Sequence, residues 1–360
     1  MNMRAIGLWL GWATKNTTRA SSWAHPIIAS AVIFSAIAWT NIRSESMPEP
    51  RLDGFNVIAT STDPFGSAAA DQSLTKAKEI GASAVAVIPF FWQPSAASPD
   101  LARGNDMNDD ELRAAIREAH ALGLAVLVKP HVWVPQSWAG AVAMHSQADW
   151  QQWFANYQRE ITHIAQIAES EKAEALAIGT ELSQTILLPQ WNDLIVETRA
   201  AFSGRLLYVA HNVEEAEMVP FWDRLDDIGV SLYPPLGDDG DRDYRRAAMR
   251  AAADRLDMLA VIYRKPVVTA EVGLRSAAGA AAKPWESAEE RAATADPALQ
   301  ADVLADWLTA LDRPTIGGVM IWRWFTDPDA GGLADTDFTV QGKPAEQVLR
   351  CAWIPSCGHG

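Results

Sequence analysis

The stretch Pro266-Val267-Val268-Thr269-Ala270-Glu271-Val272-Gly273 is a short apolar run that ends close to a carboxylate. Its β-branched residues, its length and the Pro and Gly that bound it predict a buried strand of a parallel sheet. An earlier run of the same form, Ala175-Leu176-Ala177-Ile178-Gly179-Thr180-Glu181, also ends in a glutamate. In α/β barrels, active sites are assembled at the carboxyl ends of the strands. The two runs therefore predict two carboxylates on one functional face.

The composition is that of a globular protein. The chain has 360 residues, of which 49% are hydrophobic and 21% charged, so it can bury a large core and is neither disordered nor fibrous. The formal net charge of −15, without a strong basic patch, argues against a nucleic-acid partner, because the protein would repel its phosphates. The sixteen tryptophans either pack in the core or offer exposed indole faces to sugar rings.

The amino terminus carries an apolar segment that is expected to lie outside the fold. Residues 24–42 hold no formal charge, and only basic charges precede them. Such a segment can span a bilayer with its amino end in the cytoplasm. Ala36-Ile37-Ala38 resembles a cleavage site, so a transmembrane signal anchor and a cleaved signal peptide both remain open. We expect residues 1–23 in the cytoplasm, a linker at 43–51 and an exported catalytic domain at 52–360. That domain would lie on the periplasmic or extracellular face and contact the membrane only through this segment.

Beyond the linker, apolar runs alternate with helical segments. Eight strands are expected, at 54–60, 84–91, 124–129, 175–181, 206–210, 228–233, 266–273 and 317–322. Helical segments are expected at 71–80, 108–123, 146–170, 189–202, 214–225, 243–263, 297–311 and 344–353. This repeated order predicts an α/β fold, a single (β/α)8 TIM barrel. A doubly wound sheet is the alternative, and the missing Gly-x-Gly-x-x-Gly after the first strand argues against it.

Two glutamates at the ends of separate buried strands suit the hydrolysis of a glycosidic bond. One carboxylate attacks the anomeric carbon, and the other protonates the leaving oxygen and then activates water. We expect Glu181 and Glu271, on opposite sides of the barrel, to face each other with their carboxyl groups about 5–5.5 Å apart, the spacing of a retaining enzyme. Glu181 must then start protonated and Glu271 ionised. A structural ion pair is the alternative for either residue alone.

The strand endings resemble those of a known family. Ile178-Gly179-Thr180-Glu181-Leu182-Ser183, Glu271-Val272-Gly273 and Ile321-Trp322-Arg323-Trp324 are similar to motifs of clan A of the glycoside hydrolases. Within the clan they are most similar to family 113, the bacterial β-mannanases, over roughly residues 52–353. The resemblance implies that Glu181 is the acid/base and Glu271 the nucleophile.

The resemblance also implies roles for neighbouring residues. Trp322 resembles the aromatic platform under the sugar that is cleaved, and Tyr233 resembles the tyrosine that donates a hydrogen bond to the nucleophile. Much of the clan has Asn immediately before the acid/base, where it binds the sugar 2-hydroxyl, whereas this chain has Thr180. Asn212 is a candidate substitute for that asparagine.

Further residues at the expected strand ends are candidates for substrate binding. They are Asn56, Lys129, His131 and His211 as ligands of sugar hydroxyls, and Phe91, Trp92, Trp133 and Trp138 as walls of sugar subsites. For each of them, a structural role in the core or in a hydrogen-bond network is the alternative.

No cofactor is expected, because the two-carboxylate reaction needs none. No Cys/His cluster has the spacing of a zinc site, and His120 and His163, on expected helices, are interpreted as ordinary surface or boundary residues. Cys351 and Cys357 could close a small loop after export to an oxidising compartment.

Three functions from different classes follow. The first is a retaining β-glycosidase whose substrate is a β-1,4-linked polysaccharide, mannan or glucomannan-like. The second is a barrel without catalysis that binds a glycan in a cell-envelope polysaccharide assembly. The third is another hydrolase or lyase that uses the same carboxylates. The first is preferred because both glutamates end buried strands.

Overall fold

The computed structural model describes residues 51–104 and 106–358. The expected membrane segment at 24–42 and nearly all of the linker at 43–51 lie outside these ranges, so both stay predictions. Within these ranges, no helix combines the length and the apolar character needed to cross a bilayer.

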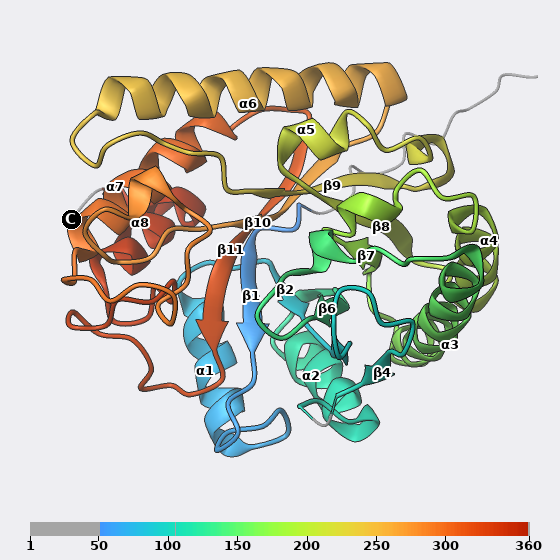
Figure 1. Cartoon of the computed structure of the whole chain (residues 1–360). Helices are drawn as coiled ribbons and strands as arrows, with labels where there is room; N and C mark the ends of the chain where they lie inside the picture. The colour runs from blue at the N-terminus through green and yellow to red at the C-terminus, as the bar shows by residue number, and fades with distance from the viewer. Residues whose placement is uncertain (1–50, 105, 359–360) are drawn as a thin grey trace, which may run out of the picture. The chain divides into compact units, whose positions relative to one another are not determined.

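The centre of the fold is a closed barrel of parallel strands (Figure 1). The strands are β1 (Gly54–Ile58), β2 (Ala84–Val87), β5 (Ala125–Val128), β7 (Ala175–Thr180), β8 (Arg205–His211), β9 (Asp227–Leu232), β10 (Val267–Val272) and β11 (Ile316–Phe325). They follow the order β1-β11-β10-β9-β8-β7-β5-β2, and β2 closes onto β1. The expected (β/α)8 barrel is confirmed in this part of the chain.

Helices surround the barrel (Figure 1). They are α1 (Ala68–Glu79), α2 (Asp109–Ala121), α3 (Gln147–Glu171), α4 (Trp191–Ala201), α5 (Asn212–Ala216), α6 (Arg242–Tyr263), α7 (Pro297–Ala310) and α8 (Pro344–Trp353). Short 3₁₀ turns occupy Ala139–Ala141, Ser183–Thr185, Trp222–Arg224, Ala280–Ala282 and Pro355–Gly358. Polar caps mark several helix starts: Asn108 accepts from two first-turn N–H groups, and Glu111 completes a capping box.

The second expected strand, 84–91, is interrupted in the structure. Pro89, which cannot donate to a strand ladder, separates β2 from the next strand. That strand, β3 (Phe90–Trp92), pairs in parallel with β6 (His131–Trp133) and antiparallel with β4 (Ala102–Arg103). The result is a small three-stranded sheet that continues the chain beyond the carboxyl ends of β2 and β5.

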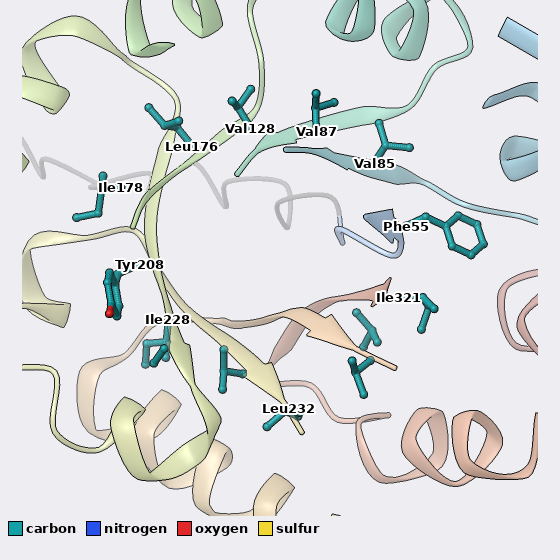
Figure 2. Packing of buried hydrophobic residues seen from close by; sticks show 14 of the residues in the cluster. Phe55, Val85, Val87, Val128, Leu176, Ile178, Tyr208, Ile228, Leu232 and Ile321 are labelled. Atoms are coloured by element: carbon teal, nitrogen blue, oxygen red, sulfur yellow. The ribbon is translucent and has the colours of Figure 1, made fainter. Parts of the chain in front are cut away.

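Two layers of buried side chains hold the barrel together. The outer layer, between strands and helices, includes Phe55, Tyr208 and Ile321 (Figure 2). The interior is filled by mostly small residues, which are Leu52, Ala84, Ala86, Leu127, Ala175, Ala177, Leu207, Val209, Val268, Ala270 and Met320. Side chains alternate along a strand, so every second residue of each strand points into the barrel.

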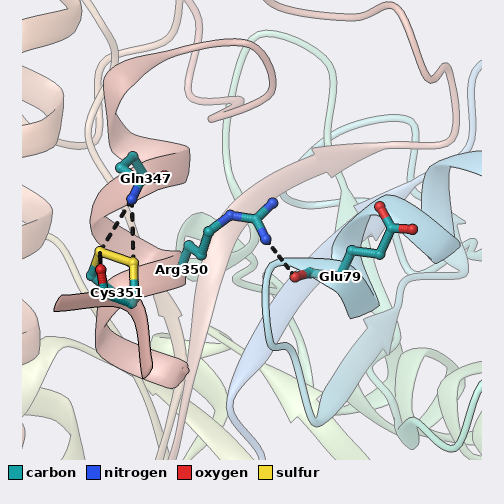
Figure 3. Close-up of a disulfide and its surroundings, with 5 residues drawn as sticks. Glu79, Gln347, Arg350 and Cys351 are labelled. Atoms are coloured by element: carbon teal, nitrogen blue, oxygen red, sulfur yellow. Dashed lines mark hydrogen bonds between the residues drawn. A yellow bond between two sulfur atoms is a disulfide. The ribbon is translucent and has the colours of Figure 1, made fainter. Parts of the chain in front are cut away.

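The last helix closes the ring of helices. Arg350 on α8 donates to the carbonyl of Glu79 at the end of α1 at 2.8 Å (Figure 3). Cys351 and Cys357 form a disulfide, and Nε2 of Gln347 lies 3.2 Å from both sulfurs. The small bridged loop suggested by the cysteine spacing is therefore present, and it begins in the last turn of α8.

Candidate active site

Polar residues reach the carboxyl face of the barrel because they extend the inward-facing side of the strands. Lys129, His211 and Trp322 each lie two residues beyond a residue that fills the barrel interior. Tyr233 directly follows β9. The alternation of the strands thus brings these side chains to one face.

Glu271 lies near the end of β10, with 6% of its surface exposed. Strict alternation after the inward-facing Ala270 would turn Glu271 outward, toward the helices. The pairing of β10 with β9 shifts between Thr269 and Glu271. Such irregularities re-aim side chains next to active sites, and here the carboxylate contacts Lys129 and Tyr233.

Both carboxylate oxygens of Glu271 have a donor. The ammonium of Lys129 donates to Oε1, and the hydroxyl of Tyr233 donates to Oε2 at 3.2 Å, which is the hydrogen bond that the resemblance implied. A Cβ at Gly273 would lie 2.3 Å from the carbonyl oxygen of Trp322. Glycine there permits the close approach of β10 and β11 behind the carboxylate.

Glu181 directly follows β7 in a strained backbone conformation. Its φ is 56°, in the left-handed region that most residues other than glycine avoid, whereas the φ of 57° at Asn212 after β8 is one that asparagine adopts more readily. Such strain costs on the order of 1–3 kcal/mol and is concentrated at functional sites. The Glu181 side chain is 13% exposed, and its Oε1 lies 3.1 Å from Nδ1 of His211.

Glu181 and His211 form an ion pair. Burial raises the pKa of Glu181, but the hydrogen bond and the charge of His211 outweigh burial and lower this pKa to about 2. Burial lowers the pKa of His211, but Glu181 reverses that shift and raises it. These shifts favour a protonated His211 beside an ionised Glu181 in the free protein. The expectation that Glu181 is protonated when the reaction starts stays a prediction.

The charges of both glutamates act on the same side chains. Each glutamate raises the pKa of Lys129, His131, His211 and Tyr233, so the two carboxylates share one site. β7 and β10 lie close to the expected opposite sides of the barrel, since four strands separate them in one direction and two, β8 and β9, in the other. His211 and Tyr233 come from these two intervening strands.

Burial also sets the protonation of the other polar groups. It lowers the pKa of Lys129 and of His131, although both carboxylates oppose the shift. It raises the pKa of Tyr233 well above its ordinary range, so the hydroxyl remains a donor. Nζ of Lys129 lies 5.3 Å from the centre of the Trp322 ring. Nδ1 of His131 is buried and has no hydrogen-bond partner within the described ranges.

Three other polar side chains form hydrogen bonds with backbone groups of the barrel. Asn56 is fully buried, and its Nδ2 donates to the carbonyl of Ala270 at 2.9 Å. The buried hydroxyl of Thr180 donates at 3.0 Å to a backbone carbonyl after β5. Oδ1 of Asn212 accepts from the backbone N–H of Tyr233 at 2.7 Å. The contacts of Asn56 and Thr180 hold strand ends together, and the contact of Asn212 orients its amide between β8 and β9.

Three of the four aromatic residues proposed as subsite walls are exposed. Trp92 and Trp133, on the three-stranded sheet, are 44% and 48% exposed, with ring centres 5.9 Å apart. Trp138 is 45% exposed, and its ring centre lies 4.9 Å from that of His211. Phe91 is fully buried in the outer core layer, so the expectation that it forms a subsite wall is wrong.

Glu215, a buried residue of α5, was not predicted from the sequence. Its carboxylate accepts from the hydroxyls of Tyr208 and Ser183 and, at 3.1 Å, from the backbone N–H of His211. The Tyr208 hydroxyl in turn accepts from the backbone N–H of Leu182 at 2.9 Å. Through these hydrogen bonds Glu215 connects the segment after Glu181 to the end of β8, which carries His211. The sequence could have pointed to Glu215 because it closely follows an expected strand end.

Other polar features of the described chain lie apart from this site. The described residues contain no group of three or more potential metal ligands. A surface hollow of about 660 Å³, lined by Arg103 and Asp109 among others, includes neither Glu181 nor Glu271. His120 and His163 pair with Glu174 and Asp109 at helix surfaces, as expected for ordinary boundary residues.

The fold and the site together define a class. A closed parallel barrel with two glutamates near the carboxyl ends of separate strands, each held by polar partners, is the arrangement of a barrel glycoside hydrolase. The model of Glycoside Hydrolase Family 113 matches residues 55–343, and the chain belongs to this family. The protein is therefore a glycoside hydrolase of the endo-β-mannanase-like kind, which confirms the resemblance seen in the strand endings.

Solved structures agree with this assignment. The chain is similar to the family 113 β-mannanase AaManA from Alicyclobacillus acidocaldarius, with 25% identity and a TM-score of 0.75 over 84% of this chain and 98% of that one. A second family 113 β-1,4-mannanase is 28% identical, with a TM-score of 0.75 over 84% of this chain and 99% of that one. The β-glucuronidase of Ruminococcus gnavus, 12% identical, with a TM-score of 0.57 over 84% of this chain and 50% of that one, shares the fold. No curated protein matches the sequence.

Proposed function

We propose that this protein is a retaining glycoside hydrolase that cleaves β-1,4-linked mannan or a glucomannan-like polysaccharide. The observation that carries the proposal is the pair of glutamates after β7 and near the end of β10, whose charges act on the same side chains. Two family 113 structures to which the chain is similar are β-mannanases, which favours mannan over other β-linked polymers.

In this proposal Glu271 is the nucleophile and Glu181 the acid/base. The Glu271 carboxylate attacks the anomeric carbon while the bond to the leaving oxygen breaks, and that oxygen takes the proton of Glu181. Water then attacks the anomeric carbon, gives a proton to Glu181 and releases Glu271 as a carboxylate. One glycosidic bond is hydrolysed, and no cofactor takes part.

His211 supplies the proton that the acid/base needs. Transfer from Nδ1 of His211 to Oε1 of Glu181, which lie 3.1 Å apart, leaves a neutral imidazole and a carboxylic acid. Desolvation disfavours both charges of the ion pair. A sugar bound over the pair excludes water and therefore favours the neutral form that can protonate the leaving oxygen.

Release of reducing ends from mannan, glucomannan and β-glucan tests the proposal. We expect the wild type to hydrolyse mannan and Glu271→Gln to lose at least about 10³-fold in kcat, because the nucleophile is gone. Glu181→Gln should lose activity on polysaccharide but keep more of it on aryl glycosides whose leaving groups need no proton. Glu217→Gln, at the exposed end of α5, is the matched control and should be fully active.

The stereochemistry of the first product gives an independent check. NMR of fresh product should show the β-anomer, and an α-anomer would contradict a nucleophilic role for Glu271. Glycan binding that both glutamate variants retain, with no turnover by the wild type, would instead support the glycan-binding barrel without catalysis.

We also propose that the barrel works outside the cytoplasm, tethered by residues 24–42 or released if they are cleaved. The bridge between Cys351 and Cys357 supports this, since disulfides persist in oxidising compartments. A carboxyl-terminal fusion to a reporter that is active only after export should be active. Activity confined to a cytoplasmic reporter would contradict the proposal.

A further inference from the structure

A buried cation lies beside the proposed nucleophile. Lys129 has no exposed surface, and its ammonium donates to Oε1 of Glu271, whose side chain is 8% exposed. The backbone N–H of Lys129 donates to the carbonyl of Val87 at 2.8 Å, which places the residue firmly in the barrel wall. The ammonium therefore meets the carboxylate out of contact with water.

The charge of Lys129 depends on its carboxylate neighbours. Burial lowers the pKa of Lys129, and the charges of Glu271 and Glu181 oppose this shift. A buried ammonium that loses its counter-charge is strongly destabilised, because the interior cannot replace the hydration that it gave up. Any step that removes the negative charge of Glu271 thus costs more with Lys129 present than without it.

We propose that Lys129 is a positioning residue for the second half of the reaction, in which its buried ammonium stabilises Glu271 as this carboxylate leaves the anomeric carbon. The inference rests on the proposed retaining function. It assigns to Lys129 a role in the release of the nucleophile, in place of the sugar-hydroxyl contact expected from its position at a strand end.

The charge on Glu271 changes in opposite directions in the two steps of the reaction. In the first step, an oxygen of Glu271 bonds to the anomeric carbon, the bond to the leaving oxygen breaks, and that oxygen takes the proton of Glu181. Glu271 becomes a neutral ester, so Lys129 loses the carboxylate that it contacts and keeps only the weaker interaction with the ionised Glu181. In the second step, a water oxygen bonds to the anomeric carbon, its proton goes to Glu181, and the ester bond breaks with its electron pair on Glu271. Negative charge returns beside the ammonium, which lowers this barrier.

The test uses the full-length protein with 2,4-dinitrophenyl β-mannobioside, whose good leaving group makes the first step fast. Lys129→Met and Lys129→Gln remove the charge while keeping a long side chain, and Lys78→Met, at an exposed position on α1, is the matched control. Rapid mixing follows the release of dinitrophenol, the mass of acid-quenched protein detects the glycosyl ester, and thermal unfolding checks that each variant folds.

In the two Lys129 variants, we expect a burst of about one equivalent of dinitrophenol and accumulation of the glycosyl ester, because the second step becomes limiting. Their kcat should fall about 10²-fold. KM should fall by more than kcat, so that kcat/KM, which reports the first step, rises, because forming the neutral ester no longer leaves a buried ammonium without its partner. In the wild type and Lys78→Met, the steady release of dinitrophenol that follows any burst should be about 10²-fold faster than in the Lys129 variants.

Several results would overturn the inference. Equal losses in kcat and kcat/KM without a burst would mean that Lys129 acts before the ester forms. A raised KM at unchanged kcat would identify a sugar-hydroxyl ligand. Equal steady rates after the burst in the wild type and in either folded Lys129 variant would show that the ammonium does not assist the second step. A wild type that releases neither dinitrophenol nor reducing ends from mannan would overturn the proposed function itself.

Discussion

At the level of single residues, the proposed acid/base and its histidine partner each shift the titration of the other. The pKa of Glu181 is lowered from its ordinary 4.5, so its contribution to stability is present above pH 4.5 and is lost as the pH falls toward 2. The pKa of His211 is raised from 6.5, so its contribution is present below pH 6.5 and is lost as the pH rises through the raised value. The ion pair therefore stabilises the fold most between pH 4.5 and 6.5.

Replacing His211 by Gln should move the basic limb of the activity profile to lower pH. In the wild type, the last proton of the pair leaves from His211, at a pKa raised above 6.5. In His211→Gln it leaves directly from Glu181, a carboxyl whose ordinary pKa is 4.5 and which burial raises. We expect a shift of roughly one pH unit or more, measured from kcat/KM against pH on a soluble mannan.

His163→Gln is the control for that shift. His163 pairs with Asp109 on the helix surface at 2.8 Å, away from both glutamates, so its loss should leave the profile unchanged. A basic limb that stays in place in His211→Gln would show that the catalytic proton does not pass through the Glu181–His211 pair.

At the level of elements, β10 shows how an irregular strand sets the chemistry. Side chains alternate with a period of two, and one shift of register moves a side chain to the opposite face of the sheet. The shift between Thr269 and Glu271 is what allows the carboxylate to meet Lys129. The amino-acid pattern of this strand predicts its burial but contains no signal for the shift.

The outer helices α6 and α7 are joined by a cluster of charges. Asp306 on α7 accepts from Arg242, Arg245 and Arg246 on α6 at 3.2, 3.2 and 2.8 Å. Burial raises the pKa of Asp306, but the three guanidinium groups outweigh it and lower this pKa. The stability that the cluster contributes is therefore present above pH 3.8 and is lost as the pH falls.

Asp306→Asn should lower the free energy of unfolding by about 3 kcal/mol at pH 7, because Arg245, 2% exposed, loses its counter-charge. Chemical denaturation measures this, and the difference from the wild type should shrink below pH 3.8. Asp302→Asn is the control: Asp302 is 57% exposed and 3.9 Å from Arg242, so its loss should cost less than about 0.5 kcal/mol. Equal losses in the two variants would contradict this account.

At the level of the whole molecule, the end of the described chain covers its beginning. β1 pairs with both β2 and β11, which closes the barrel. Phe55 of β1 packs edge-on against Trp353 of α8, with ring centres 5.2 Å apart. Arg350 joins the same helix to the end of α1, and the disulfide follows directly (Figure 3). The bridge therefore stabilises the segment that completes the ring of helices.

Changing Cys351 and Cys357 to Ser should lower the free energy of unfolding by about 2 kcal/mol, since the bridge closes only a short loop. Mannan hydrolysis should be unchanged, because within the described ranges the contacts of the bridge are with Gln347 and not with the site. Thermal unfolding with and without reductant measures the effect, and the double variant should not respond to reductant. Lost hydrolysis with an unchanged unfolding midpoint would contradict this separation of stability from activity.

Much of the architecture could be predicted because its signals are local. Apolar runs bounded by Gly or Pro marked the barrel strands, and caps such as Asn108 marked helix starts. Glu181 and Glu271 could be singled out because each ends such a run. The three-stranded sheet was missed, since its strands of two or three residues are too short to show a period.

By itself, the sequence determined the barrel and the positions of its two carboxylates, because the periodicity and the end of a strand depend on residues that are close together in the chain. Only the tertiary structure decided which groups meet those carboxylates and which of them carry charge. Lys129 and Glu271 are 142 residues apart in the chain, and Glu181 and His211 are 30 apart. Such pairs come into contact only when the barrel closes, and their proton affinities follow from the burial and the neighbours that closure creates.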